Sequence, residues 1–220
     1  MDKKIIIANW KSNKNTAQAE EFIRLFSENI NRLNLDNKQI ILAPSYSLLY
    51  TCKTLIDKYN LPVSLCAQDV SSFPEGAYTG AVNAKQIKEF ADYTIIGHSE
   101  RRDYFSESDD VLFKKVNEAK DNDLKIIYCI QNENQKIPSG VAMVAFEPPT
   151  AIGTNNPDDP KHIEEVFSQV SKSYSGKILY GGSIKADNVR NYIHIASCSG
   201  LLVGGASLEA DSFIDLIKEW

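Results

Sequence analysis

Two glycine pairs near the end of the chain have neighbours that suit an anion-binding role. Gly181-Gly182 precedes Ser183, and Gly204-Gly205 follows the last apolar run of the sequence. Glycine lets backbone N–H groups approach an anion closely, and the start of a following helix adds partial positive charge. One such pair would indicate only a tight turn. Two pairs after the last two apolar runs favour phosphate binding, and Gly153-Thr154 could close over the ligand.

Three further polar side chains each follow a different apolar run. Lys11 comes after the first run, His98 after the fourth and Glu147 after the sixth. Each one alone has an ordinary explanation: a solvated loop lysine, a structural histidine and an acid before a loop. Their joint occurrence is improbable by chance, and histidine and glutamate are residue types that general acid–base catalysis uses. The pattern therefore predicts one shared site.

Short β-branched runs alternate with amphipathic stretches along the whole chain, which predicts alternating strands and helices. The predicted strands are Lys4–Ala8, Ile40–Ala43, Val63–Ala67, Tyr93–Ile96, Lys125–Cys129, Val141–Phe146, Ile178–Tyr180 and Leu201–Val203. The predicted helices are Thr16–Leu33, Ser45–Tyr59, Ala84–Phe90, Ser108–Asn122, Pro160–Ser173, Asp187–Ile193 and Leu208–Lys218. Ser45 and Ser108 are predicted N-caps whose side-chain oxygens accept first-turn N–H groups.

The strands are apolar at consecutive positions, which indicates a parallel sheet buried on both faces. An α/β chain of this kind with eight strand–helix units predicts a closed (β/α)8 barrel formed by residues 1–220 as a single domain. A doubly wound open sheet is the alternative. The connection Ile130–Gly140 is shorter than the roughly dozen residues that a parallel crossover needs. The helix between strands 5 and 6 is therefore predicted to be missing or reduced to a turn.

Charge and cysteine usage exclude several classes of protein. The chain has 24 Lys and Arg against 29 Asp and Glu, a formal net charge of -5, and no long basic block. Neither nucleic acid nor an anionic membrane surface is an expected partner. No apolar run is long enough for a signal peptide or a membrane span, so a cytoplasmic location is predicted. The four cysteines have no CxxC spacing, which predicts buried free thiols and no metal site.

Six segments of the sequence, in their order and spacing, resemble the triosephosphate isomerase family. They are Asn9-Trp10-Lys11, Gly97–Arg102, Phe146-Glu147-Pro148, Ala151–Thr154, Tyr180–Ser183 and Leu202–Leu208. The resemblance covers nearly the whole chain except Ile130–Gly140. It implies a TIM barrel isomerase of glycolysis and gluconeogenesis that needs no cofactor. Such an enzyme interconverts dihydroxyacetone phosphate and D-glyceraldehyde 3-phosphate by proton transfer through an enediol(ate) intermediate.

The resemblance also implies roles for individual residues. Glu147 would be the base that moves a proton between C1 and C2 of the substrate, and His98 the neutral electrophile that polarises its oxygens. This family is itself the standard example of a neutral catalytic histidine placed at a helix start. Lys11 would supply a fixed positive charge to the enediolate, and Asn9 a polar contact beside it.

A second set of implied residues surrounds these groups. Phosphate binding is assigned to Gly153, Ser183, Gly204 and Gly205, with Asn9 and Lys11 also in contact with the substrate. Glu100 is similar to the family's acid that contacts the lysine. Ser99 and Cys129 are implied neighbours of Glu147 and His98.

A homodimer is also implied by the resemblance. The segment Gly76, Ala77, Tyr78, Thr79 and Gly80 is similar to the family's interdigitating loop, which would reach toward the partner's Asn9 and the partner's Lys11. Without the resemblance, the same segment would be interpreted as a surface turn.

Two other functions stay open on the residues alone. The glycine pairs would equally suit another phosphate-binding barrel enzyme, such as an epimerase or a synthase. An altered segment after Glu147, with Pro149-Thr150 and Asn155–Pro157 in place of the usual residues, would suit a non-catalytic phosphosugar-binding barrel. The set of His98, Glu147 and Lys11 argues against both.

Overall fold

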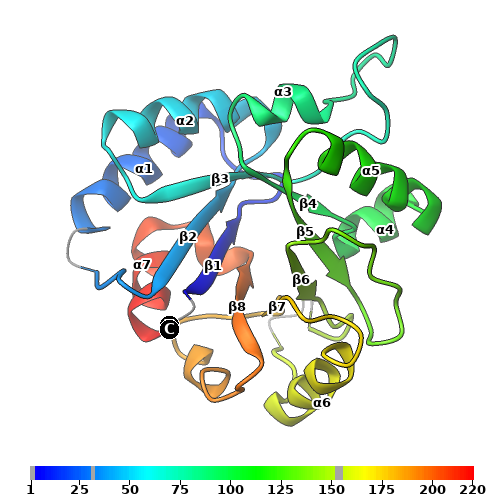
Figure 1. Cartoon of the computed structure of the whole chain (residues 1–220). Coiled ribbons are helices and arrows are strands. Elements are labelled where there is room, and N and C mark those ends of the chain that lie inside the picture. The colour runs from blue at the N-terminus through cyan, green and yellow to red at the C-terminus, as the bar shows by residue number, and fades with distance from the viewer. Residues whose placement is uncertain (1–2, 31–32, 152–155) are drawn as a thin grey trace.

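Eight parallel strands close into a barrel in the computed structural model, which describes residues 3–30, 33–151 and 156–220. The strands pair in chain order, and β8 pairs with β1 to complete the barrel (Figure 1). They are β1 Lys4–Asn9, β2 Lys38–Ala43, β3 Val63–Ala67, β4 Tyr93–Ile96, β5 Lys125–Ile130, β6 Met143–Phe146, β7 Lys177–Tyr180 and β8 Cys198–Val203. The predicted (β/α)8 barrel is confirmed, and the open-sheet alternative is wrong.

The apolar character of the strands follows from burial on both faces. In β1, Ile5 and Ile7 belong to the cluster inside the barrel, whereas Ile6 and Ala8 belong to the cluster between strands and helices. All four are at most 1% exposed. Because successive side chains of a strand point to opposite faces, a strand covered on both sides must be apolar at every position.

A single glycine permits the barrel to close between β8 and β1. A Cβ atom at Gly200 would lie 2.1 Å from the backbone oxygen of Ile5, far inside van der Waals contact. The same residues, Ile5 and Gly200, are register partners in the β1–β8 pairing. Any side chain at this position would push the two strands apart.

Helices surround the barrel on its outside (Figure 1). They are α1 Thr16–Ile30, α2 Leu49–Lys58, α3 Ala84–Lys88, α4 Ser99–Phe105, α5 Asp109–Asp121, α6 Pro160–Val170 and α7 Ala210–Glu219. α1 buries Phe22, Ile23 and Phe26, which are spaced to share one helix face. None of the helices in the described ranges is long and apolar enough to span a membrane.

The two predicted N-caps have different outcomes. Ser108 caps α5, and its hydroxyl accepts the Val111 N–H at 3.4 Å. Ser45 makes no side-chain cap, because its hydroxyl lies 3.0 Å from the Ser47 hydroxyl instead. The predicted helix Ser45–Tyr59 is therefore divided into a 3-10 turn, Tyr46–Leu48, and α2.

Two other helix predictions need correction. The predicted helix Asp187–Ile193 contains only a 3-10 turn, Val189–Asn191, in which Val189 is the one buried residue. Conversely, α4 was not predicted as a helix. Its sequence has no apolar periodicity, and Ser99 is its only buried residue. A seven-residue helix of this kind leaves no amphipathic signal.

The connection between β5 and β6 contains no helix. β5 ends at Ile130 and β6 begins at Met143, two residues later than predicted, and residues 131–142 form turns and irregular chain. Ile137 and Val141 of this segment pack against the hydrophobic core. Tyr128 on β5 is only 1% exposed. The predicted loss of the helix is confirmed, and the barrel surface beneath it is covered.

The four cysteines are buried and free, as predicted. Burial raises the pKa of the Cys52 thiol to about 12 and that of Cys198 to about 11. These thiols are protonated at neutral pH and pack as small apolar groups.

Candidate active site

Polar residues that follow several strands line one cavity of about 320 Å³. Parallel strands all run in the same direction, so the segments at their carboxyl ends meet at one end of the barrel. Of the predicted site residues, the cavity is lined by Asn9, Lys11, His98, Glu147, Ser183, Gly204 and Gly205. Gly153 lies outside the described residues. Side chains separated by up to almost the whole chain are thereby brought together.

His98 and Glu147 are in direct contact within this cavity. His98 Nε2 lies 2.9 Å from Glu147 Oε1, and both side chains are almost fully buried. The second carboxylate oxygen of Glu147 accepts the Ser99 backbone N–H at 2.8 Å. His98 is the N-cap residue of α4, and Glu147 follows β6. Two elements that are distant in sequence thus place an imidazole against a carboxylate.

The protonation state of His98 is determined by the hydrogen-bond partners of its two ring nitrogens. Burial is the largest single influence and lowers the pKa of His98, but the carboxylates of Glu147 and Glu100 together raise it by more, so the net shift of this pKa is upward. His98 Nδ1, however, accepts the Glu100 backbone N–H at 3.2 Å. A nitrogen that accepts a hydrogen bond carries no proton, so this contact selects the neutral ring with its proton on Nε2. The start of α4 opposes the positive charge that Glu147 favours.

The pKa of Glu147 is lowered although its side chain is buried. Burial acts to raise this pKa, but the interaction with His98 and the hydrogen bond from Ser99 N–H outweigh it. The Cys129 thiol also donates a hydrogen bond to the carboxylate. Glu147 is therefore an ionised carboxylate held in a water-poor environment, where each hydrogen bond is stronger than in water.

Cys129 and Ser99 both adjoin the carboxylate, where the resemblance expects them. Burial and the negative charge of Glu147 hold the pKa of the Cys129 thiol well above its usual value, so it stays a donor. The Ser99 hydroxyl oxygen is buried and has no hydrogen-bond partner among the described residues. The hydrogen bond from Ser99 to Glu147 is therefore made by the backbone N–H of Ser99.

Lys11 lines the cavity from the loop after β1. Its ammonium binds a carboxylate oxygen of Glu100 at 2.5 Å, which is the expected acid contact. Asn9 Oδ1 accepts the Lys11 backbone N–H at 3.0 Å. Lys11 has a left-handed backbone with φ of 53°, which is uncommon for a residue with a side chain. The positive charge is therefore fixed by both its backbone and its ion pair.

Gln68 is a supporting residue that the sequence did not assign to the site. Its side-chain amide donates to the backbone oxygens of Lys11 at 2.9 Å and of Ala43 at 2.8 Å. The signal available in the sequence was its position directly after the third strand. Nothing local shows that it reaches the Lys11 backbone, because that contact depends on the neighbouring strands.

The glycine segments Gly181-Gly182 and Gly204-Gly205 line the same cavity. A Cβ atom at Gly182 would lie 2.7 Å from the Tyr180 hydroxyl, and one at Gly204 would lie 3.1 Å from Lys11 Cε. Around Gly205, apart from its chain neighbours, no heavy atom of a described residue lies within 4 Å of such a position. Backbone N–H groups can be approached closely here, as an anion site requires.

Comparisons with known proteins identify the family of the chain. The sequence profile described as triosephosphate isomerase matches residues 4–142 and 139–220. The chain belongs to the triosephosphate isomerase family. The family member of Dictyoglomus turgidum is 32% identical over 252 residues, which covers 99% of this chain and 100% of the relative. That of Thermodesulfovibrio yellowstonii is 34% identical over 250 residues, with 99% and 100% covered.

The family match also locates the main departure of this chain. The two matched segments meet within residues 139–142, at the end of the connection between β5 and β6. A third triosephosphate isomerase, from Mesomycoplasma hyorhinis, aligns over 244 residues at 34% identity, although this chain has 220 residues. The shortening thus falls on the helical side of the fifth unit, away from the cavity.

The remaining potential ligands are scattered. Within residues 3–30, 33–151 and 156–220, no three His, Cys, Asp or Glu side chains are grouped in a way that could hold a metal ion. The groups that do converge on the cavity are a carboxylate, an imidazole and an ammonium. This set is suited to moving a proton and stabilising a developing negative charge.

Proposed function

We propose that this triosephosphate isomerase uses Glu147 as the base and His98 as the electrophile in the interconversion of dihydroxyacetone phosphate and D-glyceraldehyde 3-phosphate. The observation that carries the proposal is the 2.9 Å contact between His98 Nε2 and Glu147 Oε1 at the cavity surface. A substrate carbonyl oxygen that accepts a hydrogen bond from His98 Nε2 must take the place of the Glu147 carboxylate as the acceptor of that hydrogen bond. The displaced carboxylate then lies beside the carbon atoms of the substrate.

This exchange of partners increases the basicity of Glu147. In the free site, His98 lowers the pKa of Glu147 against the opposing effect of burial. When substrate takes the Nε2 hydrogen bond, burial becomes the larger influence and the Glu147 pKa rises. A base with a higher pKa removes a carbon-bound proton more readily, and such general base catalysis contributes about 10² to 10⁴ in rate.

His98 and Lys11 would stabilise the charge that this proton transfer creates. A neutral imidazole donates from Nε2 to the substrate oxygens and returns its proton more easily than an imidazolium would. Lys11 contributes a fixed positive charge close to the enediolate, and Asn9 holds the Lys11 backbone. One preorganised donor of this kind lowers the barrier by about 3 kcal/mol.

The phosphate would bind at the glycine segments. Backbone N–H groups of Ser183, Gly204 and Gly205 are the proposed donors, together with Gly153. Binding energy from this non-reacting group can be used to position the substrate and exclude water, since an exposed enediolate can expel phosphate.

The proposed base is tested by Glu147→Gln, which keeps the side-chain shape but removes the proton acceptor. We expect kcat to fall by at least about a hundredfold, because general base catalysis is lost. Binding of inorganic phosphate, measured by calorimetry, should be retained. The matched control is Glu164→Gln on α6, an exposed position that does not line the cavity. Substantial turnover by Glu147→Gln would show that another group is the base.

A coupled assay of turnover with D-glyceraldehyde 3-phosphate distinguishes the alternative functions. An epimerase or synthase would bind phosphate without converting aldose to ketose. A phosphosugar-binding barrel would bind the substrate and leave it unchanged. Conversion of D-glyceraldehyde 3-phosphate by the wild-type chain excludes both.

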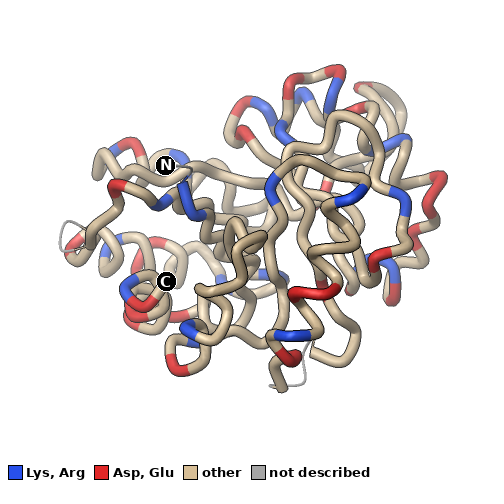
Figure 2. The backbone as a smooth tube through the Cα atoms, turned by 60° about the horizontal axis from the view of Figure 1, so that its bottom comes forward, with Lys and Arg blue, Asp and Glu red and all other residues tan. Residues whose placement is uncertain are grey.

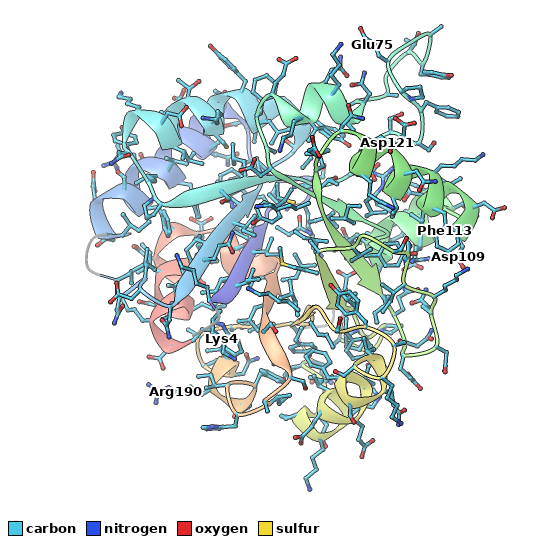
Figure 3. The ribbon with its side chains drawn as sticks, in the orientation of Figure 1. Lys4, Glu75, Asp109, Phe113, Asp121 and Arg190 are labelled. Atoms are coloured by element: carbon cyan, nitrogen blue, oxygen red, sulfur yellow. The ribbon has the colours of Figure 1, made fainter. Side chains whose placement is uncertain are left out.

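We also infer a homodimer formed through the loop Gly76, Ala77, Tyr78, Thr79 and Gly80. This loop lies between β3 and α3 and extends outward from the barrel (Figure 1), and Figure 3 labels Glu75 at its outer part. The rings of Phe73 and Tyr78 stack at 4.4 Å while 45% and 42% exposed. Two stacked aromatic side chains on a projecting loop are suited to insertion into a partner surface.

The cytoplasmic location of the chain stays a prediction from the sequence.

A further inference from the structure

We propose that Lys185 is a phosphate-binding residue of this site that captures and holds the substrate's dianionic group by its unpaired positive charge. The inference rests on the proposed isomerase function, because it names a further contact of the same cavity. Lys185 lines the cavity together with Gly181, Gly182 and Ser183. It thus lies on the side of the cavity where the phosphate is proposed to bind.

The backbone that carries Lys185 is held in place. Asn188 Oδ1 accepts the Lys185 backbone N–H at 2.9 Å, and the Asn188 side-chain amide donates to the Ser183 backbone carbonyl oxygen at 3.0 Å. The Lys185 oxygen accepts the Val189 N–H at 3.0 Å. Ile184 is 4% exposed and anchors the turn in the core. The turn therefore presents Lys185 at a defined place on the rim of the cavity.

The charge of Lys185 is not neutralised by the protein. The two lysines that line the cavity are Lys11 and Lys185, and Lys11 is paired with Glu100. The side chain of Lys185 is exposed, and its ammonium makes no hydrogen bond or ion pair with any residue in the described ranges. A cation at the rim of a binding cavity is thus available to an external anion.

Because the whole molecule carries a net negative charge, an unpaired cation beside the cavity would help it to attract an anionic substrate. The formal net charge is -5, and Figure 2 shows Lys and Arg interspersed with Asp and Glu around the chain. Glu147 adds a buried negative charge within the cavity itself. A dianionic substrate therefore approaches a molecule of its own sign. Local positive charge at a cleft raises the rate of association with an anion and lowers the rate of its escape.

The central test is Lys185→Gln, compared with Lys114→Gln. Lys114 is an exposed lysine on α5 that has no ion-pair partner among the described residues and does not line the cavity, so both variants change the net charge equally. At about 0.01 M ionic strength, where the Debye length is about 30 Å, we expect Lys185→Gln to lower kcat/KM about three- to tenfold, mainly through KM. Lys114→Gln should stay within about twofold of the wild type, because Lys114 does not line the cavity and so cannot contact the bound phosphate.

Salt and a second substrate separate a charge effect from a structural one. The difference between Lys185→Gln and the wild type should shrink steadily as salt is raised to about 0.5 M, because screening removes the attraction. Turnover of D-glyceraldehyde, which has no phosphate, should not show the loss in kcat/KM. A loss that is independent of salt, or that is equal for D-glyceraldehyde, would overturn the proposal.

A binding measurement keeps this inference distinct from the proposed function. Inorganic phosphate is titrated into the wild type and into Lys185→Gln by calorimetry at low salt. The Kd for phosphate should rise in the variant about three- to tenfold, in line with the effect on KM. Equal Kd values would overturn the role of Lys185 even if the wild type is an active isomerase. Failure of the isomerase function would instead be seen as absence of turnover by the wild type.

Discussion

Lys11 is the residue at which the site depends most on support from a distant side chain. Its φ of 53° lies in the left-handed region, which a residue with a side chain adopts only when its surroundings require it. The Gln68 amide holds the Lys11 oxygen from one side, and Asn9 Oδ1 holds its N–H from the other. The position of the ammonium in the cavity is thus a product of backbone contacts.

Removing the amide of Gln68 should therefore reduce activity without removing any group that touches the substrate. We expect Gln68→Leu to lower kcat/KM by about tenfold to a hundredfold, because small displacements of a positioned charge are costly. Steady-state kinetics with D-glyceraldehyde 3-phosphate measures the change.

Gln39→Leu is the matched control for this variant. Gln39 also donates from its amide, to the Tyr93 hydroxyl at 2.8 Å, but it lies at the amino end of β2, opposite the cavity. It should lower the melting temperature to a similar extent and leave kcat/KM nearly unchanged. Equal losses of kcat/KM in the two variants would contradict a positioning role for Gln68.

At the scale of elements, buried charges attach α5 to the rest of the barrel. Lys115 on α5 is 4% exposed and binds both carboxylate oxygens of Asp69 at 2.6 and 2.7 Å, and Glu107 at 2.5 Å. Arg101 on α4 binds the same two acids, at 3.0 and 2.6 Å. Since His98 is the N-cap residue of α4, this network also stabilises the helix that selects the neutral histidine.

Loss of the central lysine should be strongly destabilising. Lys115→Met leaves two buried carboxylates with Arg101 as their one ion-pair partner among the described residues, and breaking such a network costs about 3–5 kcal/mol. We expect the free energy of unfolding in urea to fall by this amount. Lys114→Met, at the neighbouring exposed position, should change it by less than about 0.5 kcal/mol. A small effect of Lys115→Met would show that the network contributes little net stability.

The elements also show where sequence patterns succeed. Strands β1 to β8 were predicted because a buried parallel strand is apolar along most of its length, a signal contained in four to six neighbouring residues. The same reasoning failed for α4, which buries only Ser99, and for residues 187–193, where a 3-10 turn replaces the helix. The conformation of these segments depends on tertiary contacts, which the spacing of apolar residues along the sequence does not show.

At the scale of the whole molecule, exposed aromatic side chains on one projecting loop bear on its assembly. Tyr78 of the proposed dimer loop stacks on the nearby Phe73, and both rings are exposed and belong to neither hydrophobic core cluster. If a partner surface buries these rings, a charged side chain introduced in place of Tyr78 would have to be desolvated when the dimer forms. Desolvation of a charge is costly, so such a substitution would oppose association.

We expect sedimentation velocity at micromolar concentration to show a dimer for the wild type and a monomer for Tyr78→Asp. The reason is the desolvation of a carboxylate in an apolar interface. Tyr59→Asp, at a tyrosine on the end of α2 that is 36% exposed, is the matched control and should stay dimeric. A wild-type chain that sediments only as a monomer would contradict the proposed assembly.

The sequence by itself determined the alternation of strands and helices, the short connection between β5 and β6, and the order of the motifs that mark the family. These features are local, because they depend on the polarity and spacing of neighbouring residues. Only the tertiary structure decided that His98 contacts Glu147, that Gln68 reaches the Lys11 backbone, and that Lys185 lines the cavity unpaired. The physical reason is closure of the barrel, which sets distances between side chains that are far apart along the chain.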